Sequence, residues 1–167
     1  MAALTNLIQP SNVATTNNNN TFTATQIFSG SASQLGLVVN DIIETVTISP
    51  AAATGTITYD ITTQSVMYYT GAATANWTIN IRASSTTTLN TALAVGQSIS
   101  IAFLSTQGAT AYYNNVLQVD GVTITPKWQG GVAPTAGNPN GIDMYTYTIV
   151  KTAASTYTVL GSMVRFV

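Results

Sequence analysis

Apolar and polar residues alternate with a period of two along most of the chain beyond residue 35, which is the pattern of half-buried β-strands. In the clearest segment, residues 76–82, Trp77, Ile79 and Ile81 share one face and polar residues occupy the other. The core residues predicted from the two clearest strands are Trp77, Ile79, Ile81, Ile99, Ile101 and Phe103. Strands are predicted at 42–48, 56–61, 66–70, 76–82, 98–103, 112–119, 122–125, 144–151 and 156–160, the last running on to 167.

Turn and helix signals separate these strands. Asp120-Gly121 predicts a two-residue hairpin, because both residue types tolerate positive φ. Residues 88–95 depart from the strand pattern, and Thr88 as N-cap with Gly96 beyond the end predicts one or two helical turns. Many short strands with almost no helix predict an all-β fold, an antiparallel two-sheet β-sandwich of jelly-roll type over residues 35–167.

Residues 1–34 differ from the rest, because they are almost all Thr, Asn, Ser and Ala and lack the strand period. So little apolar area does not offset the entropy of ordering a separate fold, and we expect an extended N-terminal arm. Such an arm is either disordered or ordered along a neighbouring subunit. The spaced apolar residues favour the second use, and those predicted to contact a partner are Leu4, Leu7, Ile8 and Phe22.

Charge is scarce: the 167 residues include five acidic and four basic side chains, with no His and no Cys. Typical domains carry about 25% charged residues, against 5% here. A net charge of −1 gives almost no long-range field, so neither nucleic acid nor an anionic membrane surface is an expected partner. Weak charge repulsion favours association, and we expect an ordered homo-oligomer rather than a monomer kept soluble by Thr and Asn.

The expected compartment follows from the same composition. No disulfide is possible without Cys, which suits assembly in a reducing cytoplasm. The first ten residues, MAALTNLIQP, have neither a basic segment nor a continuous apolar stretch, so we expect neither a secretion signal nor an anchor.

Catalytic constellations are hard to assemble from these residues. Nucleophile–base catalysis commonly needs His, so only Ser–Lys variants remain, and Lys127 and Lys151 are expected to be solvated lysines at strand edges. Glycoside hydrolysis needs two carboxylates roughly 5–9.5 Å apart. Asp41 and Glu44 are three residues apart, which places them on opposite faces of a strand. The other carboxylates, Asp60, Asp120 and Asp143, are isolated in the sequence, so we expect no enzymatic activity and no cofactor.

The irregular stretch at residues 129–141 is long enough to be a functional loop. Asn138, Asn140 and Asp143 have a spacing faintly like that of a calcium loop, but one carboxylate is too few, and we expect an Asn-Pro-Asn-Gly turn without metal. Trp128 opens the loop and is the expected exposed contact residue, joined by Asn138 and Asn140. The tyrosines and Trp77 either form a carbohydrate-stacking surface or fill the core, and Trp77 has the phase of a core residue.

Four segments carry a resemblance. NWTINIRASSTTTLNTALAVGQSISIAFL (76–104), AYY (111–113), VDGVTITPKWQGGVAPTAGNPNGID (119–143) and YTIVKTAASTYTVLGS (147–162) closely resemble a β-rich module in virion structural proteins of cyanobacterial and marine tailed bacteriophages. The resemblance covers about residues 54–167 and implies a phage particle. It implies no catalytic residues.

Two virion roles are compatible with that resemblance. The first is a capsid decoration or cement protein on the virion surface, a homotrimer contacting the major capsid protein or other virion proteins, with the arm extended over neighbouring subunits. The alternative is a tail-fibre or receptor-binding protein whose loop at 130–141 contacts host polysaccharide. No shaft repeats are seen in the sequence, which favours decoration.

Overall fold

The computed structural model of the protein describes residues 40–167. The strands of these described residues all lie in one compact unit, Ile43–Val167. The predicted partner contacts Leu4, Leu7, Ile8 and Phe22, and the arm to which they belong, lie outside the described residues.

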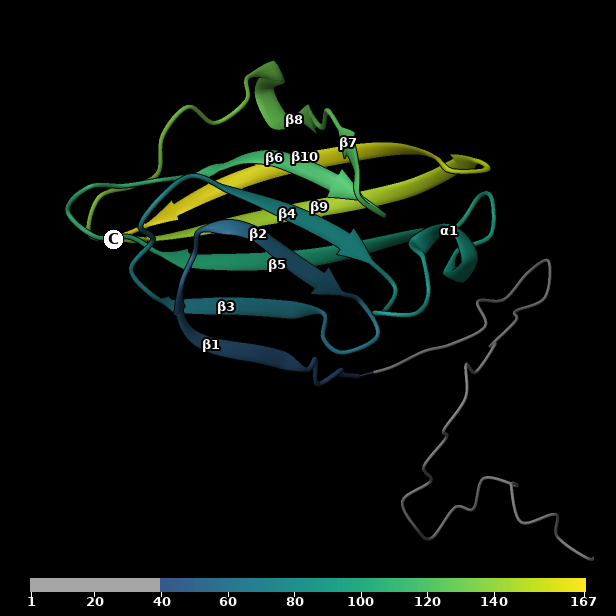
Figure 1. Ribbon diagram of the computed structural model, residues 1–167, viewed down its shortest axis with the longest axis horizontal. Coiled ribbons are helices and arrows are strands. Elements are labelled where there is room, and N and C mark those ends of the chain that lie inside the picture. The colour runs from purple at the N-terminus through teal and green to yellow at the C-terminus, as the bar shows by residue number, and fades with distance from the viewer. Residues whose placement is uncertain (1–39) are drawn as a thin grey trace, which may run out of the picture. The chain divides into compact units, whose positions relative to one another are not determined.

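The described chain is an all-β fold of two stacked sheets, as predicted (Figure 1). The six-stranded sheet has the order β1-β3-β5-β9-β10-β8 and the four-stranded sheet the order β2-β4-β6-β7. The strands are β1 Val46–Ala52, β2 Gly55–Asp60, β3 Val66–Gly71, β4 Trp77–Arg82, β5 Ser98–Thr106, β6 Asn114–Val119, β7 Val122–Ile124, β8 Lys127–Trp128, β9 Ile142–Ala153 and β10 Thr156–Phe166. The helices are α1 Leu89–Ala92 and the 3₁₀ turn η1 Gln129–Gly131.

The predicted antiparallel pairing is wrong for most of the fold. Five strand pairs in the described residues are parallel: β1–β3, β3–β5, β2–β4, β4–β6 and β8–β10. Antiparallel pairing is confined to β5–β9, β9–β10 and β6–β7. Jelly rolls are antiparallel throughout, so this topology does not confirm the jelly-roll expectation.

Four of these parallel pairs, all but β8–β10, arise because consecutive strands from β1 to β6 alternate between the two sheets. Each strand therefore returns to its own sheet in its original direction, and the intervening strand in the other sheet acts as the crossover that parallel pairs require. Three turns of a flattened coil result. The long hairpin β9–β10 then extends the six-stranded sheet, and β7 folds back on β6 through the predicted Asp120-Gly121 turn, whose φ angles of 52° and 80° are both positive (Figure 1).

The core lies between the inward faces of the sheets, and the predicted register is confirmed. Trp77 is 1% exposed and packs on Phe103 and edge-on to Tyr145, with ring centroids 6.0 and 5.9 Å away. Ile79, Ile81, Ile101 and Phe103 are buried, and Ile99 is half-buried against the same cluster. The tyrosines Tyr59, Tyr145 and Tyr147 are also core residues, and burial raises the pKa of each hydroxyl above its usual value.

One buried asparagine, Asn114, ties the two sheets together. Its backbone N–H donates to the Tyr145 hydroxyl at 3.2 Å, and its side-chain oxygen accepts from the Tyr147 hydroxyl at 2.6 Å. The side-chain NH₂ donates to the carbonyls of Trp77 and Val116 at 2.8 and 2.9 Å. The β4–β6 register shifts at this point, and the asparagine bonds one of the carbonyls at the irregularity.

The predicted helical turns are confirmed as α1, which connects β4 to β5. The Thr88 side chain caps it by accepting from the Thr91 N–H. Asp120 provides a second cap that the sequence did not reveal, because its carboxylate accepts from the N–H groups of Leu89 and Asn90 at 2.7 and 3.0 Å. Acceptors at a helix N-terminus satisfy otherwise unpaired donors.

The other end of α1 is held by Lys151 on β9. Its Nζ donates to the carbonyls of Asn90 and Leu93, and the residue is 7% exposed. The expectation that Lys151 is a solvated edge lysine is therefore wrong, since its ammonium satisfies carbonyls at the end of the helix. Lys127 is exposed as predicted.

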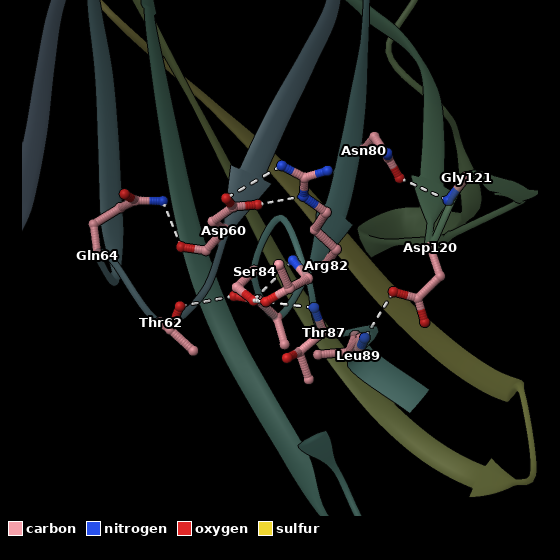
Figure 2. A network of polar contacts seen from close by, with 12 residues as sticks. Asp60, Thr62, Gln64, Asn80, Arg82, Ser84, Thr87, Leu89, Asp120 and Gly121 are labelled. Atoms are coloured by element: carbon pink, nitrogen blue, oxygen red, sulfur yellow. Dashed lines mark hydrogen bonds and ion pairs between the residues drawn. The ribbon is translucent and has the colours of Figure 1, made fainter. Parts of the chain in front are cut away.

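Polar contacts continue from α1 along the ends of the four-stranded sheet, and Figure 2 shows them together. The Arg82 guanidinium forms an ion pair with Asp60, its neighbour in the β2–β4 register, at 2.6 Å. Gln64 donates to the Asp60 carbonyl, and Gly121 N–H donates to the Asn80 side chain. These contacts fix the turns at this end of the sandwich.

Candidate contact surfaces

Trp128 lies where β8 joins the edge of the six-stranded sheet. β8 pairs in parallel with β10, so that Trp128 stands opposite Gly161. A Cβ at Gly161 would meet the indole ring at 3.1 Å, so the glycine allows the ring to lie against the strand. The indole also contacts Tyr147 edge-on, with centroids 5.8 Å apart. Trp128 is therefore half-buried, and the expectation of a freely exposed side chain is only partly met.

Two hollows flank Trp128, and both are bordered by Ala133 and Pro134 of the following loop. One, of about 260 Å³, lies toward β6 and β7 and includes Tyr113 and Asn115. The other, of about 280 Å³, lies toward β10 and includes Arg165. Ligand sites usually measure about 300–1,000 Å³, so both hollows are slightly smaller than a usual ligand site.

The predicted contacts Asn138 and Asn140 do not line either hollow. They form the expected turn, in which the Gly141 N–H donates to the Asn138 carbonyl and Asn140 has a φ of 59°. The Asn138 side chain donates to the Phe166 carbonyl at 3.3 Å. Asn138 is half-buried and Asn140 is exposed, so only Asn140 presents its side chain freely.

Asp143 anchors this turn from inside the fold. It is fully buried, and its Oδ2 accepts from the Asn138 N–H at 3.1 Å. Its Oδ1 and the Nε2 of Gln107 are both buried and make no hydrogen bond. Burial raises the pKa of the Asp143 carboxyl, and this effect is partly offset by the Asn138 N–H and by the positive charge of Arg165. The carboxylate thus organises the loop.

The carboxylates on β2 and in the β6–β7 turn are also occupied by the chain itself. Asp60 binds Arg82, and Asp120 binds the N-terminus of α1. The Tyr157 hydroxyl donates to Asp120 at 3.5 Å, and burial together with this carboxylate raises the pKa of Tyr157 to about 12. Within residues 40–167, no three acidic residues gather as they would around a metal ion.

The outer face of the six-stranded sheet is a second candidate surface, one that the sequence analysis did not identify. Its exposed apolar side chains include Val46, Ile48, Val164 and Phe166, which are 46%, 66%, 42% and 47% exposed. The period-two pattern could have identified these residues, because they occupy the strand positions that alternate with those of the core residues. Only the sheet order and the pairing register show that they share one face, Val46 and Ile48 on the edge strand β1 and Val164 and Phe166 on β10 toward the other edge.

Comparison of the chain with protein-family models, curated protein sequences and solved structures gave no match. Neither helix of the described segment is long and apolar enough to cross a membrane.

Proposed function

We propose that this protein is a non-enzymatic structural component of a bacteriophage particle: a capsid decoration protein that binds the outer shell and stabilises it. The observation that carries the proposal is the outer face of the six-stranded sheet, where the long strands present only apolar and hydroxyl side chains. Such side chains cost less to desolvate than Lys or Glu, so the surface is suited to extensive packing against protein.

The resemblance of residues 54–167 to virion modules supports the particle context. The use of the charged groups supports a structural role, because Asp60, Asp120 and Asp143 each bind groups of the chain itself. In this proposal the arm at residues 1–34 extends over neighbouring subunits and attaches the sandwich to the major capsid protein. The homotrimer expected from the sequence remains a prediction.

A tail-fibre or receptor-binding role is the second candidate, and the site at Trp128 favours it. An indole edge between two small hollows, with amide and hydroxyl side chains nearby, suits a neutral sugar ring. Host polysaccharide is the ligand class in that case. Trp128→Ala should then abolish glycan binding, whereas Val122→Ala, at an exposed position outside both hollows, should leave it unchanged.

Particles that lack the protein distinguish the two functions. A decoration protein predicts depleted particles of normal geometry that burst at lower temperature, and added purified protein should restore their resistance with little dependence on ionic strength. Protein lacking residues 1–34 should keep its β circular dichroism but fail to restore resistance. If depleted particles are equally robust but do not adsorb to host cells, the decoration function is wrong and the fibre function takes its place.

A further inference from the structure

A row of five apolar side chains crosses the outer face of the six-stranded sheet. The register aligns Ile48 with Tyr68, Tyr68 with Leu104, Leu104 with Met144, and Met144 with Val164. These residues alternate with core residues such as Phe103 and Tyr145, which are fully buried, so the row points away from the core. Each member is exposed or half-exposed.

The neighbouring rows extend the apolar strip on both sides. On one side Val46, Val66 and Ala102 lie in register, followed by Thr146 and Ser162. On the other side Ile142 pairs with Phe166 and with Thr106. Farther along β5 and β9 the face becomes hydroxyl-rich, and Ser100 hydrogen-bonds Thr148 across the strands at 2.8 Å. The strip is therefore bordered by polar but uncharged side chains.

Charge is absent from this face over β1, β3, β5, β9 and β10. The charged residues on these strands are Asp143, Lys151 and Arg165, and all three have the inward phase of the alternation. The charges that border the face are Lys127 on the two-residue edge strand β8 and the exposed Glu44, two positions before Val46. On the five strands themselves an approaching surface meets no ionic group.

The size of the face matches that of a stable interface. Strand spacing and rise give it about 600 Å² in projection, close to the roughly 800 Å² per partner buried in standard interfaces. The apolar strip is the central part of this face, and the hydroxyl side chains make up the rest.

We propose that this face binds the same face of a second copy of the chain, forming a two-fold symmetric pair of sandwiches in place of the homotrimer expected from the sequence and leaving contact with any shell to the arm. A two-fold axis near Leu104, the middle of the row, places the apolar strip of one copy on that of the other. The hydroxyl-rich zones then surround the apolar centre, which is the arrangement of protein interfaces. Sheets pack face to face about 10 Å apart, so one partner sheet can cover the strip from β1 to β10.

Two substitutions at Leu104 test the pair on the purified full-length chain, independently of any virion role. Leu104→Lys introduces two like charges near the axis and should raise the dimer dissociation constant by about 100-fold in sedimentation equilibrium. Because the chain has no Cys, Leu104→Cys supplies a single thiol and should give a disulfide-linked dimer on mild oxidation. Val164→Lys, at the exposed end of the row, repeats the first test if Leu104→Lys does not fold.

Thr78 provides the matched control, because it is half-buried on the outer face of β4 in the other sheet. Thr78→Lys should change the dissociation constant by less than about 2-fold, and Thr78→Cys should not cross-link. A full-length chain that remains monomeric overturns the proposal, as does a chain that pairs only after residues 1–34 are deleted, which would place the arm on this face. Equal cross-linking through Leu104→Cys and Thr78→Cys, or a trimer insensitive to Leu104→Lys, would also refute it.

Discussion

Asn114 is the residue whose loss should reveal most about what holds the two sheets together. Asn114→Ala removes three side-chain hydrogen bonds. The Tyr147 hydroxyl is fully buried and has no other partner, and the Trp77 carbonyl loses a donor inside the core. The Val116 carbonyl is only partly buried and can turn to water.

Each buried polar group left without a partner costs about 1–3 kcal/mol. Two such groups and a small cavity should therefore lower the free energy of unfolding by about 3–5 kcal/mol, a large share of the roughly 5–15 kcal/mol of a typical domain. Urea unfolding followed by circular dichroism measures the change. Asn115→Ala is the matched control, since the adjacent side chain is exposed, and it should stay within about 0.5 kcal/mol of the wild type.

A double-mutant cycle tests whether the lost hydrogen bond to the Tyr147 hydroxyl causes the destabilisation. Tyr147→Phe removes the hydroxyl that Asn114→Ala would leave unpaired, so the double variant should be less destabilised than the sum of the single variants by about 1–2 kcal/mol. If Asn114→Ala costs less than about 1 kcal/mol, or if the two changes add without coupling, the network does not stabilise the fold as argued.

Three further substitutions test other contacts. Trp77→Ala should cost about 3–5 kcal/mol in urea unfolding, and Trp77→Phe clearly less, because the buried indole N–H has no partner; equal losses would contradict this difference. Asp120→Ala should cost about 1–3 kcal/mol and speed hydrogen exchange at the Leu89 and Asn90 amides, which the carboxylate binds; unchanged exchange would count against this cap. Burial raises the folded-state pKa of Asp143 above its unfolded value, so its contribution to stability is full below the unfolded pKa and is lost as pH rises through the folded pKa. Asp143→Asn should therefore remove this fall in the free energy of unfolding with rising pH, measured by urea unfolding between about pH 3.5 and 7. An unaltered fall would assign the pH dependence to other groups.

The strands were predictable because the alternation of side chains is local. The segment at 76–82 became β4 with its phase intact, and the Asp120-Gly121 turn formed as expected. Pairing was not predictable, since the same alternation suits a hairpin and an arch that crosses to the other sheet. The two residues between β1 and β2 make such an arch, and this alternation between sheets produces four of the five parallel pairs in the described residues.

The contacts that the sequence did not reveal join residues far apart in the chain. Asp120 meets Leu89 across 31 positions, and Lys151 meets Asn90 across 61. Each residue also had a sufficient local explanation, a turn for the aspartate and a strand edge for the lysine. The half-burial of Trp128 could not be predicted from the sequence, because β8 is only two residues long and shows no strand pattern.

The outer face of the six-stranded sheet carries no charge over β1, β3, β5, β9 and β10 because the fold uses its few ionic groups for contacts within the chain. Asp60 and Arg82 pair across two strands, Asp120 and Lys151 hold the two ends of α1, and Asp143 anchors the loop after β8. These groups bind polar atoms of the chain itself, so few charged side chains remain for the outer surfaces of the sheets. The broad outer face of the six-stranded sheet is left to Thr, Ser and apolar residues, which suit contact with another neutral surface, and association there should be insensitive to salt.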